Sequence, residues 1–243
     1  MLGIVLDVAT VVFFIIMFKK CAVKSQLKNA MESVTYIVSS VVAVPIAVFL
    51  GDFCYSSFFR PVIMGRIEKT VMDSGNVDTS LTTVDRIMNH MPTMVNNGAR
   101  IYHTTSGDNL NRLNLLLAGD LSSATGEIVD ILARSVIDGV VRALFFAVVF
   151  AGCYRLLRAF YPTVEAYFYN PDRAAVSPTN GMVLGAGKIV VIFLMILSMI
   201  QLVGPVLPDF VLFRPETYSQ SYIFKIFSEN NLLMLFLGEG ITG

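Results

Sequence analysis

The stretch VTYIVSSVVAVPIAVFL, residues 34–50, decides the fold of this chain because it carries no charged side chain and is long enough to cross a lipid bilayer. A spanning helix rises about 1.5 Å per residue and crosses about 30 Å of hydrocarbon, which takes about 20 mostly apolar residues. Backbone groups in lipid must bond within their own segment, so such stretches are expected to be helices. Three further stretches meet the same requirement: residues 2–18, 139–157 and 182–207.

The composition agrees with a membrane protein and excludes other classes. Of the 243 residues, 55% are hydrophobic and 15% are charged, and the mean hydropathy is +0.67. Lysine plus arginine number 18, as do aspartate plus glutamate, so no basic field exists to bind nucleic acid. Three scattered cysteines form neither a disulfide framework nor a zinc site. We therefore expect an all-α, polytopic membrane protein with four transmembrane helices, forming a single membrane domain over residues 1–243.

Basic residues indicate how the predicted spans are oriented. Four lysines lie in the connection after the first span: Lys19, Lys20, Lys24 and Lys28. Arg155 and Arg158 close the third span, and Arg173 lies in the connection to the fourth. Short connections rich in lysine and arginine stay on the cytoplasmic side, so we predict both termini outside. The first span has no basic segment before it and no small-residue cleavage site after it. We interpret it as a retained helix rather than a secretory signal.

The long predicted outer loop, residues 51–134, is expected to carry short amphipathic helices. Apolar residues recur there at helical spacing before a proline: Val84, Ile87, Met88, Met91 and Pro92. We expect this segment to lie flat on the membrane, followed by a polar loop over residues 96–111. Beyond the fourth span, residues 209–243 are predicted to form an amphipathic tail.

A series of charged residues, alternating in sign from Asp130 on, leads into the third span. Glu127, Asp130, Arg134, Asp138 and Arg142 follow one another at three- and four-residue steps. This spacing places them on one face of a helix. We interpret the ladder as ion pairing near the membrane interface.

Small residues predict where the spans pack, because they let helix backbones approach closely in lipid. We predict that the small-residue stripes of the second and third spans meet. Pro45 is expected to kink the second span or to free a carbonyl near Val41. Thr35 and Gln201 are expected to hydrogen-bond across helices. The small residues are Ser39, Ala43, Ala47 and Gly51 in the second span, Gly139, Ala143, Ala147 and Ala151 in the third, and Gly181 and Gly185 at the start of the fourth.

Three charged residues within the predicted spans are the polar candidates for function: Asp7, Arg142 and Lys188. A charge at the centre of a span costs about 2.5 to 3.5 kcal/mol on insertion scales, so each needs a partner or a role. Asp7 and Arg142 have comparable predicted depths near the outer side, which allows them to pair. Lys188 can snorkel to the cytoplasmic side or reach Glu32. For each residue, a proton or substrate relay is the alternative interpretation.

No stretch of the sequence indicates a metal, a cofactor or catalysis. Met88, Met91 and Met94 lie beside His90, and soft thioethers favour Cu(I). Because Met88 and Met91 already fit the apolar face of a helix, we assign no metal. The other histidine, His103, lies in the predicted polar loop. The motifs of common hydrolases and ATPases are absent, so we expect a protein that is not an enzyme and uses no cofactor.

Three short motifs follow one another along the chain. The first span has an early acid, Asp7, and ends in Phe18-Lys19-Lys20, followed by Val23-Lys24-Ser25. The fourth span begins with Gly181-Met182-Val183-Leu184-Gly185 and contains Lys188. The tail carries Ser228-Glu229-Asn230-Asn231 after an aromatic-rich turn. In this order the motifs resemble the colicin V production protein family (CvpA-like), small proteins of the bacterial inner membrane. Cys21 and Ile189 stand where that family often has glycine.

The resemblance implies a non-enzymatic, multi-pass protein of the bacterial cytoplasmic (inner) membrane that supports peptide-toxin production and export or envelope maintenance. Its implied partners are the lipid bilayer and either copies of itself or a protein of the export or envelope machinery. The alternative is a small ion- or proton-coupled transporter or channel subunit that uses Asp7 and Arg142. An intramembrane enzyme is a third interpretation, but the serines Ser39 and Ser40 have no histidine at membrane depth.

Overall fold

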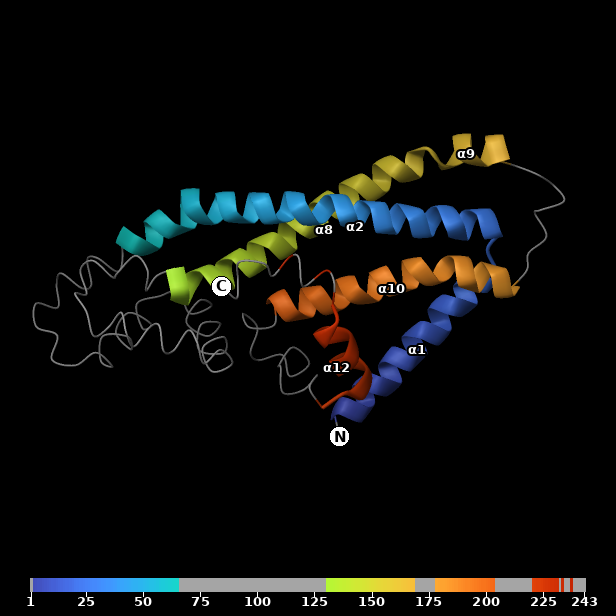
Figure 1. The fold of residues 1–243 in the computed structure, drawn as a ribbon, viewed down its shortest axis with the longest axis horizontal. Coiled ribbons are helices and arrows are strands. Elements are labelled where there is room, and N and C mark those ends of the chain that lie inside the picture. Colours follow the sequence, from blue (N-terminus) through green and yellow to red (C-terminus); the bar gives the residue numbers. More distant parts are fainter. Residues whose placement is uncertain are drawn as a thin grey trace, which may run out of the picture.

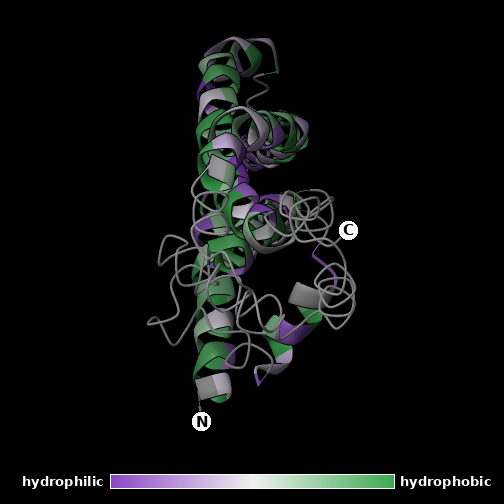
Figure 2. Cartoon of the chain, turned by 90° about the vertical axis from the view of Figure 1, so that its left-hand side faces the viewer, coloured by the Kyte–Doolittle hydropathy of each residue, from purple (hydrophilic) through white to green (hydrophobic). Residues whose placement is uncertain are grey.

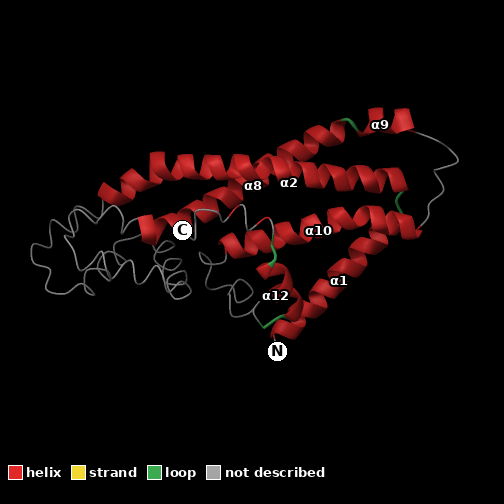
Figure 3. Cartoon of the chain, in the orientation of Figure 1, coloured by secondary structure: helices red, strands yellow, loops and turns green. Residues whose placement is uncertain are grey.

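A computed structural model describes residues 2–65, 130–168, 178–203 and 220–231, together with Leu233 and Leu237. These described residues form helices, turns and short connections, and no strand occurs among them (Figure 3). The helical segments are α1 (Leu2–Ala22), α2 (Gln26–Cys54), η1 (Tyr55–Phe59), η2 (Asp130–Arg134), α8 (Ser135–Ala159), α9 (Tyr161–Phe168), α10 (Pro178–Val203) and α12 (Tyr222–Glu229).

Three helical stretches are long and apolar enough to cross a membrane: Gln26–Gly65, Val136–Phe168 and Thr179–Val203. They contain the predicted second, third and fourth spans, except for residues 204–207, which lie outside the described residues. Hydrophobic residues predominate along these helices (Figure 2). The all-helical prediction is therefore confirmed for the described residues, and three helical stretches have the length and apolar composition that a membrane span needs.

The second span extends well beyond its apolar part. α2 begins at Gln26, where Ser25 caps the helix by accepting a hydrogen bond from the backbone N–H of Lys28. It continues unbroken through Pro45. Because proline has no N–H, the carbonyl of Val41 lacks its usual helical donor there.

Two of the long helices, α8 and α10, lie beside α2, whereas α1 lies beside α10 (Figure 1). α2 packs against α8 and against α10, and α10 also packs against α1. α12 lies against both α1 and α10, near the N-terminus of the chain. α2 is thus covered on two sides, whereas much of α1 is open, with a row of exposed apolar side chains: Ile4, Val5, Val8, Val11, Val12, Ile15 and Ile16.

Two apolar clusters hold these helices together. One joins α2, α8, α10 and the last described residue, with Ala43, Ala47, Phe146, Leu202 and Leu237 at its centre. The other joins α10 to α12 through Phe193, Leu197 and Phe224, with aromatic rings of α1 packed around them. The predicted amphipathic tail is therefore represented among the described residues by α12, which buries its aromatic face.

The predicted meeting of the two small-residue stripes is only half right. All four small residues of α2 are buried, as are Gly139 and Ala143 of α8, but Ala147 and Ala151 are exposed. A four-residue step overshoots one helical turn by about 40°, so a straight stripe drifts off one face of the helix. α8 keeps contact by turning Phe146 and Phe150 inward instead. α2 buries its whole stripe because two helices cover it.

The sequence also predicted hydrogen bonds for Thr35 and Gln201 and two segments of the outer loop. Thr35 of α2 accepts a hydrogen bond from the Tyr161 hydroxyl of α9, which confirms its predicted bond across helices. Gln201 accepts one from Asn231, which follows α12 and is not in a helix. Tyr161 belongs to α9, which the sequence analysis did not identify. The amphipathic segment at residues 84–91 and the loop at 96–111 lie outside the described residues.

Candidate functional site

Arg142 of α8 and Asp138, four residues before it, are the two most buried charges in the described residues. The Arg142 side chain is 1% exposed, and its guanidinium lies 2.9 Å from Asp52 Oδ1 and 2.7 Å from Asp138 Oδ2. Nη1 also donates to the carbonyl oxygen of Leu237 over 2.7 Å. Since Asp138 is 0% exposed, each buried charge has an opposite charge beside it. One planar guanidinium thus joins α2, α8 and the C-terminal segment.

Gly51 makes room for this arrangement. A Cβ atom at Gly51 would collide with Cγ of Arg142 and lie 2.8 Å from Asp138 Oδ1. The last member of the small-residue stripe in α2 therefore lets the arginine pass between the helices. The stripe and the buried arginine are each visible in the sequence, but their contact depends on how α2 and α8 pack.

A second layer of ion pairs surrounds the first. Arg60 donates to both oxygens of Asp130, through Nε at 2.9 Å and Nη2 at 3.1 Å, and the Tyr55 hydroxyl also donates to Asp130. Arg134 lies 3.4 Å from Asp52 and near the face of the Tyr55 ring. Within the predicted ladder, Asp138 and Arg142 pair as expected. Asp130 and Arg134 instead pair with Arg60 and Asp52, and Glu127 lies outside the described residues. We call the three arginines and three aspartates of the two layers the Asp52 network: Asp52, Arg60, Asp130, Arg134, Asp138 and Arg142.

The predicted pair between Asp7 and Arg142 is wrong. Asp7 instead accepts hydrogen bonds from the Ser221 hydroxyl at 2.6 Å and from the backbone N–H groups of Ile223 and Tyr222 at 2.9 and 3.2 Å. It therefore caps the N-terminus of α12, where free N–H groups and the helix dipole favour a carboxylate. Equal predicted depth was not enough to pair the two residues, because α1 packs against α10 and α12 rather than beside Arg142.

The predicted contact of Lys188 with Glu32 is present. Their charged atoms lie 2.5 Å apart, and Lys24 binds the same carboxylate at 2.6 Å. Glu32 and Lys188 are both buried. Glu32 thus joins the turn after α1 to α2 and α10, and we call these three residues the Glu32 cluster.

Close packing beside the Glu32 cluster depends on Gly181 and Gly185. A Cβ at Gly181 would lie 2.9 Å from the carbonyl oxygen of Cys21, and one at Gly185 would lie 2.5 Å from the Cys21 sulfur. Asn29, fully buried, donates to the same carbonyl at 2.7 Å. The two glycines therefore bring the start of α10 against the end of α1, a partner that their spacing alone did not identify.

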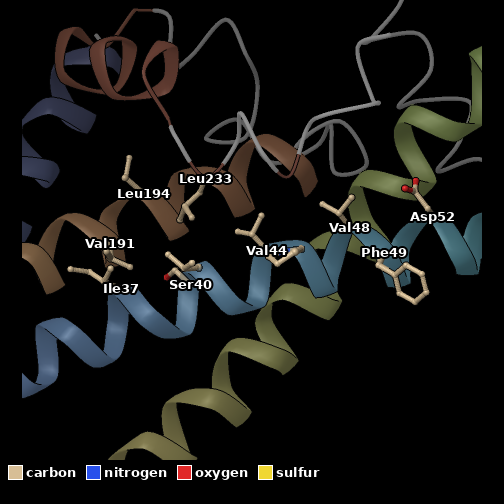
Figure 4. Close-up of a pocket in the computed structure, with 11 residues that line it drawn as sticks. Ile37, Ser40, Val44, Val48, Phe49, Asp52, Val191, Leu194 and Leu233 are labelled. Carbon is tan, nitrogen blue, oxygen red and sulfur yellow. The ribbon is translucent and has the colours of Figure 1, made fainter.

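A pocket of about 780 Å³ lies between α2 and α10 (Figure 4). Its walls are apolar except for Ser40 and Asp52, and Leu233 lines it as well. We call it the apolar pocket. A second pocket of about 460 Å³, the charged pocket, shares Phe49 and Asp52 with it and is also lined by Arg60, Asp130 and Arg134. Neither pocket was predicted, because pockets form between segments that are distant in the sequence.

The polar side chains of the described helices are arranged for structural pairing. Among the described residues, no group of three histidine, cysteine, aspartate or glutamate side chains is placed to hold a metal ion. The three cysteines are free, and Cys21 is buried. His90 and His103 lie outside the described residues. The candidate functional features of the described residues are therefore the Asp52 network, the Glu32 cluster and the two pockets.

Comparisons with protein-family models, with curated proteins and with solved structures find no match for this chain. The class of protein that the structure defines is an all-helical protein with three helices able to cross a membrane. The resemblance to the colicin V production family rests on short sequence motifs alone.

Proposed function

We propose that this chain is a non-enzymatic integral protein of the bacterial inner membrane that supports export of a peptide toxin or maintenance of the envelope. One observation carries the non-enzymatic part. Each candidate charge is bound by a structural partner: Asp7 by the start of α12, Arg142 by two carboxylates, and Lys188 by Glu32. Charges held in this way join helices to one another. The export or envelope role is supported by the sequence resemblance alone.

The proposed placement in the membrane has four spans, in which α1 is added to the three helical stretches described above as the first span along the chain. α1 has 21 residues, a length of about 31 Å at 1.5 Å per residue, and carries the exposed apolar row described above. Lys19 and Lys20 in its last turn favour a cytoplasmic end there, which puts both termini outside.

Cysteine labelling tests this topology. In a variant lacking the three native cysteines, Gly65→Cys is expected to react with a membrane-impermeant thiol reagent in spheroplasts. Val23→Cys, in the turn after α1, is the matched control because Val23 is 81% exposed, and it is expected to react only after lysis. The reverse pattern would overturn the proposed orientation.

Complementation tests the proposed role. The chain is expressed in a bacterium that lacks its own colicin V production protein, and secreted toxin is measured by growth inhibition of a sensitive strain. Restored secretion is the expected result. Because Arg142 has a structural role, Arg142→Gln is expected to reduce secretion only as far as it reduces the amount of folded protein. Normal abundance without any restoration of secretion or envelope integrity would overturn the proposal.

A transporter or channel subunit is the second candidate, favoured by the position of Asp52. This half-buried carboxylate lies where the apolar and charged pockets meet and also pairs with Arg142. In this alternative, Asp52 and Asp138, rather than Asp7, act together with Arg142 in coupling to ions or protons. Purified protein in liposomes under an imposed potential decides between the two candidates. Proton or ion flux that disappears in Asp52→Asn at equal protein amount would establish the transporter.

A further inference from the structure

The apolar pocket is an elongated slot along the membrane-spanning part of α2. Its lining on that helix runs from Ile37 to Asp52, a distance of about 22 Å at 1.5 Å per residue. The opposite wall is α10, through Val191 and Leu194 (Figure 4). One leaflet of a bilayer contributes about 15 Å of hydrocarbon, half of the core. The slot is therefore long enough to hold the acyl chain of one lipid.

One end of this slot is polar and lies at the level expected for lipid headgroups. The uncharged part of the span ends at Leu50, and the two pockets meet at Asp52, just beyond it. The charged pocket then continues to Arg60 and Arg134. An apolar slot that opens onto arginines at the membrane interface matches an amphiphile with an apolar chain and a charged head.

Arg134 is the arginine of the charged pocket with hydrogen-bonding capacity left. Arg60 is engaged by both oxygens of Asp130. Arg134 makes one long contact, 3.4 Å to Asp52, and its buried Nε has no acceptor among the described residues. A guanidinium prefers a planar, forked contact with two anionic oxygens, which a phosphate offers.

We propose that the two pockets form one binding site for a membrane phospholipid, with an acyl chain between α2 and α10 and its phosphate on Arg134. The aspartates of the charged pocket balance its arginines, so the bound headgroup adds one phosphate to a neutral site. The proposal shares the membrane placement of α2 and α10 with the proposed function, but not its export role. Failure of lipid binding and failure of complementation are therefore separate results.

Native mass spectrometry of the purified full chain tests the site. Delipidated protein in detergent is titrated with phosphatidylethanolamine and, separately, with diacylglycerol of the same chains. We expect one retained phospholipid per chain and about tenfold weaker retention of diacylglycerol, because a charge-assisted contact to phosphate is lost. Equal retention of the two lipids, or none, would overturn the phosphate contact.

Two variant pairs locate the lipid. Val41→Trp fills the slot from a position that is 66% exposed, so the fold is expected to survive and retention of both lipids to fall; Val42→Trp, outside the pocket, is the control. Arg134→Gln is expected to remove the preference for phospholipid, whereas Arg155→Gln, an exposed arginine of α8, is expected to keep it. Unchanged binding in Val41→Trp, or a dimer whose contact involves Val41 and excludes lipid, contradicts the proposal.

Discussion

The two ends of α2 hold buried charge in different ways. At the Glu32 end, two lysines from neighbouring segments bind one carboxylate. At the Asp52 end, three arginines and three aspartates form two layers, and Arg142 alone binds two carboxylates and a carbonyl. A lysine is a point charge on a flexible stem, whereas an arginine presents several donors in one plane. We therefore expect the lysine cluster to adjust to a lost partner more readily than the arginine network.

Among the substitutions at the two ends of α2, Arg142→Gln should have the largest effect on stability. It leaves Asp138 buried without its opposite charge, which is expected to lower the free energy of unfolding by about 3–5 kcal/mol. The measurement is thermal unfolding of purified protein in detergent. Arg155→Gln, exposed on the same helix, should stay within about 0.5 kcal/mol of the parent. A double variant, Arg142→Gln with Asp138→Asn, should recover part of the loss.

Gly51→Ala perturbs the packing at the Asp52 end of α2 and leaves its charges unchanged. Its Cβ would push on Arg142 and Asp138, so we expect a loss of about 1–3 kcal/mol in the same unfolding measurement. Gly152→Ala is the control, since nothing lies within 4 Å of its new methyl group. That substitution should be neutral or stabilising, because alanine is the better helix former. Equal effects of the two would mean that Gly51 does not make room for the arginine.

Glu32→Gln is expected to have a smaller effect at the other end of α2. The amide keeps an acceptor, and Lys24 and Lys188 can extend their charged ends toward water, so we expect a loss of about 1–2 kcal/mol. A loss as large as that of Arg142→Gln would show that the two ends do not differ in adaptability. Thermal unfolding at matched detergent and salt provides the value.

Asp7→Ala should have the smallest and most local effect. It removes the acceptor for the first N–H groups of α12, so these amides should exchange hydrogen faster while those of α2 and α8 stay protected. Asp7→Asn, which can also cap a helix, should retain most of the protection. Hydrogen exchange followed by mass spectrometry makes the measurement. Loss of protection in α8 with Asp7→Ala would restore the idea of a link between Asp7 and Arg142.

Much of the candidate site was visible in the sequence as separate parts. The ladder from Asp130 to Arg142 predicted ion pairs, and the spacing of Lys188 allowed its contact with Glu32. Asp52 was not predicted as a partner of Arg142. Its position is a usable signal, however, because it is an acidic residue just beyond the uncharged stretch of the second span. The role of Asp7 was missed because the N-cap at Ser221 lies more than two hundred positions further along the chain.

The sequence alone was enough to predict helices, their approximate limits, and the apolar length that a membrane span needs. These properties depend on the hydrophobicity of one segment and on hydrogen bonds within its own helix. They can therefore be predicted without knowing which other helices pack against it. Only the tertiary structure decided that Arg142 binds Asp52 and Asp138, that Phe146 and Phe150 replace half of a small-residue stripe, and that a pocket opens between α2 and α10. These features depend on which helices are neighbours and on how each is rotated about its axis. Both are determined by contacts between side chains that are distant in the sequence.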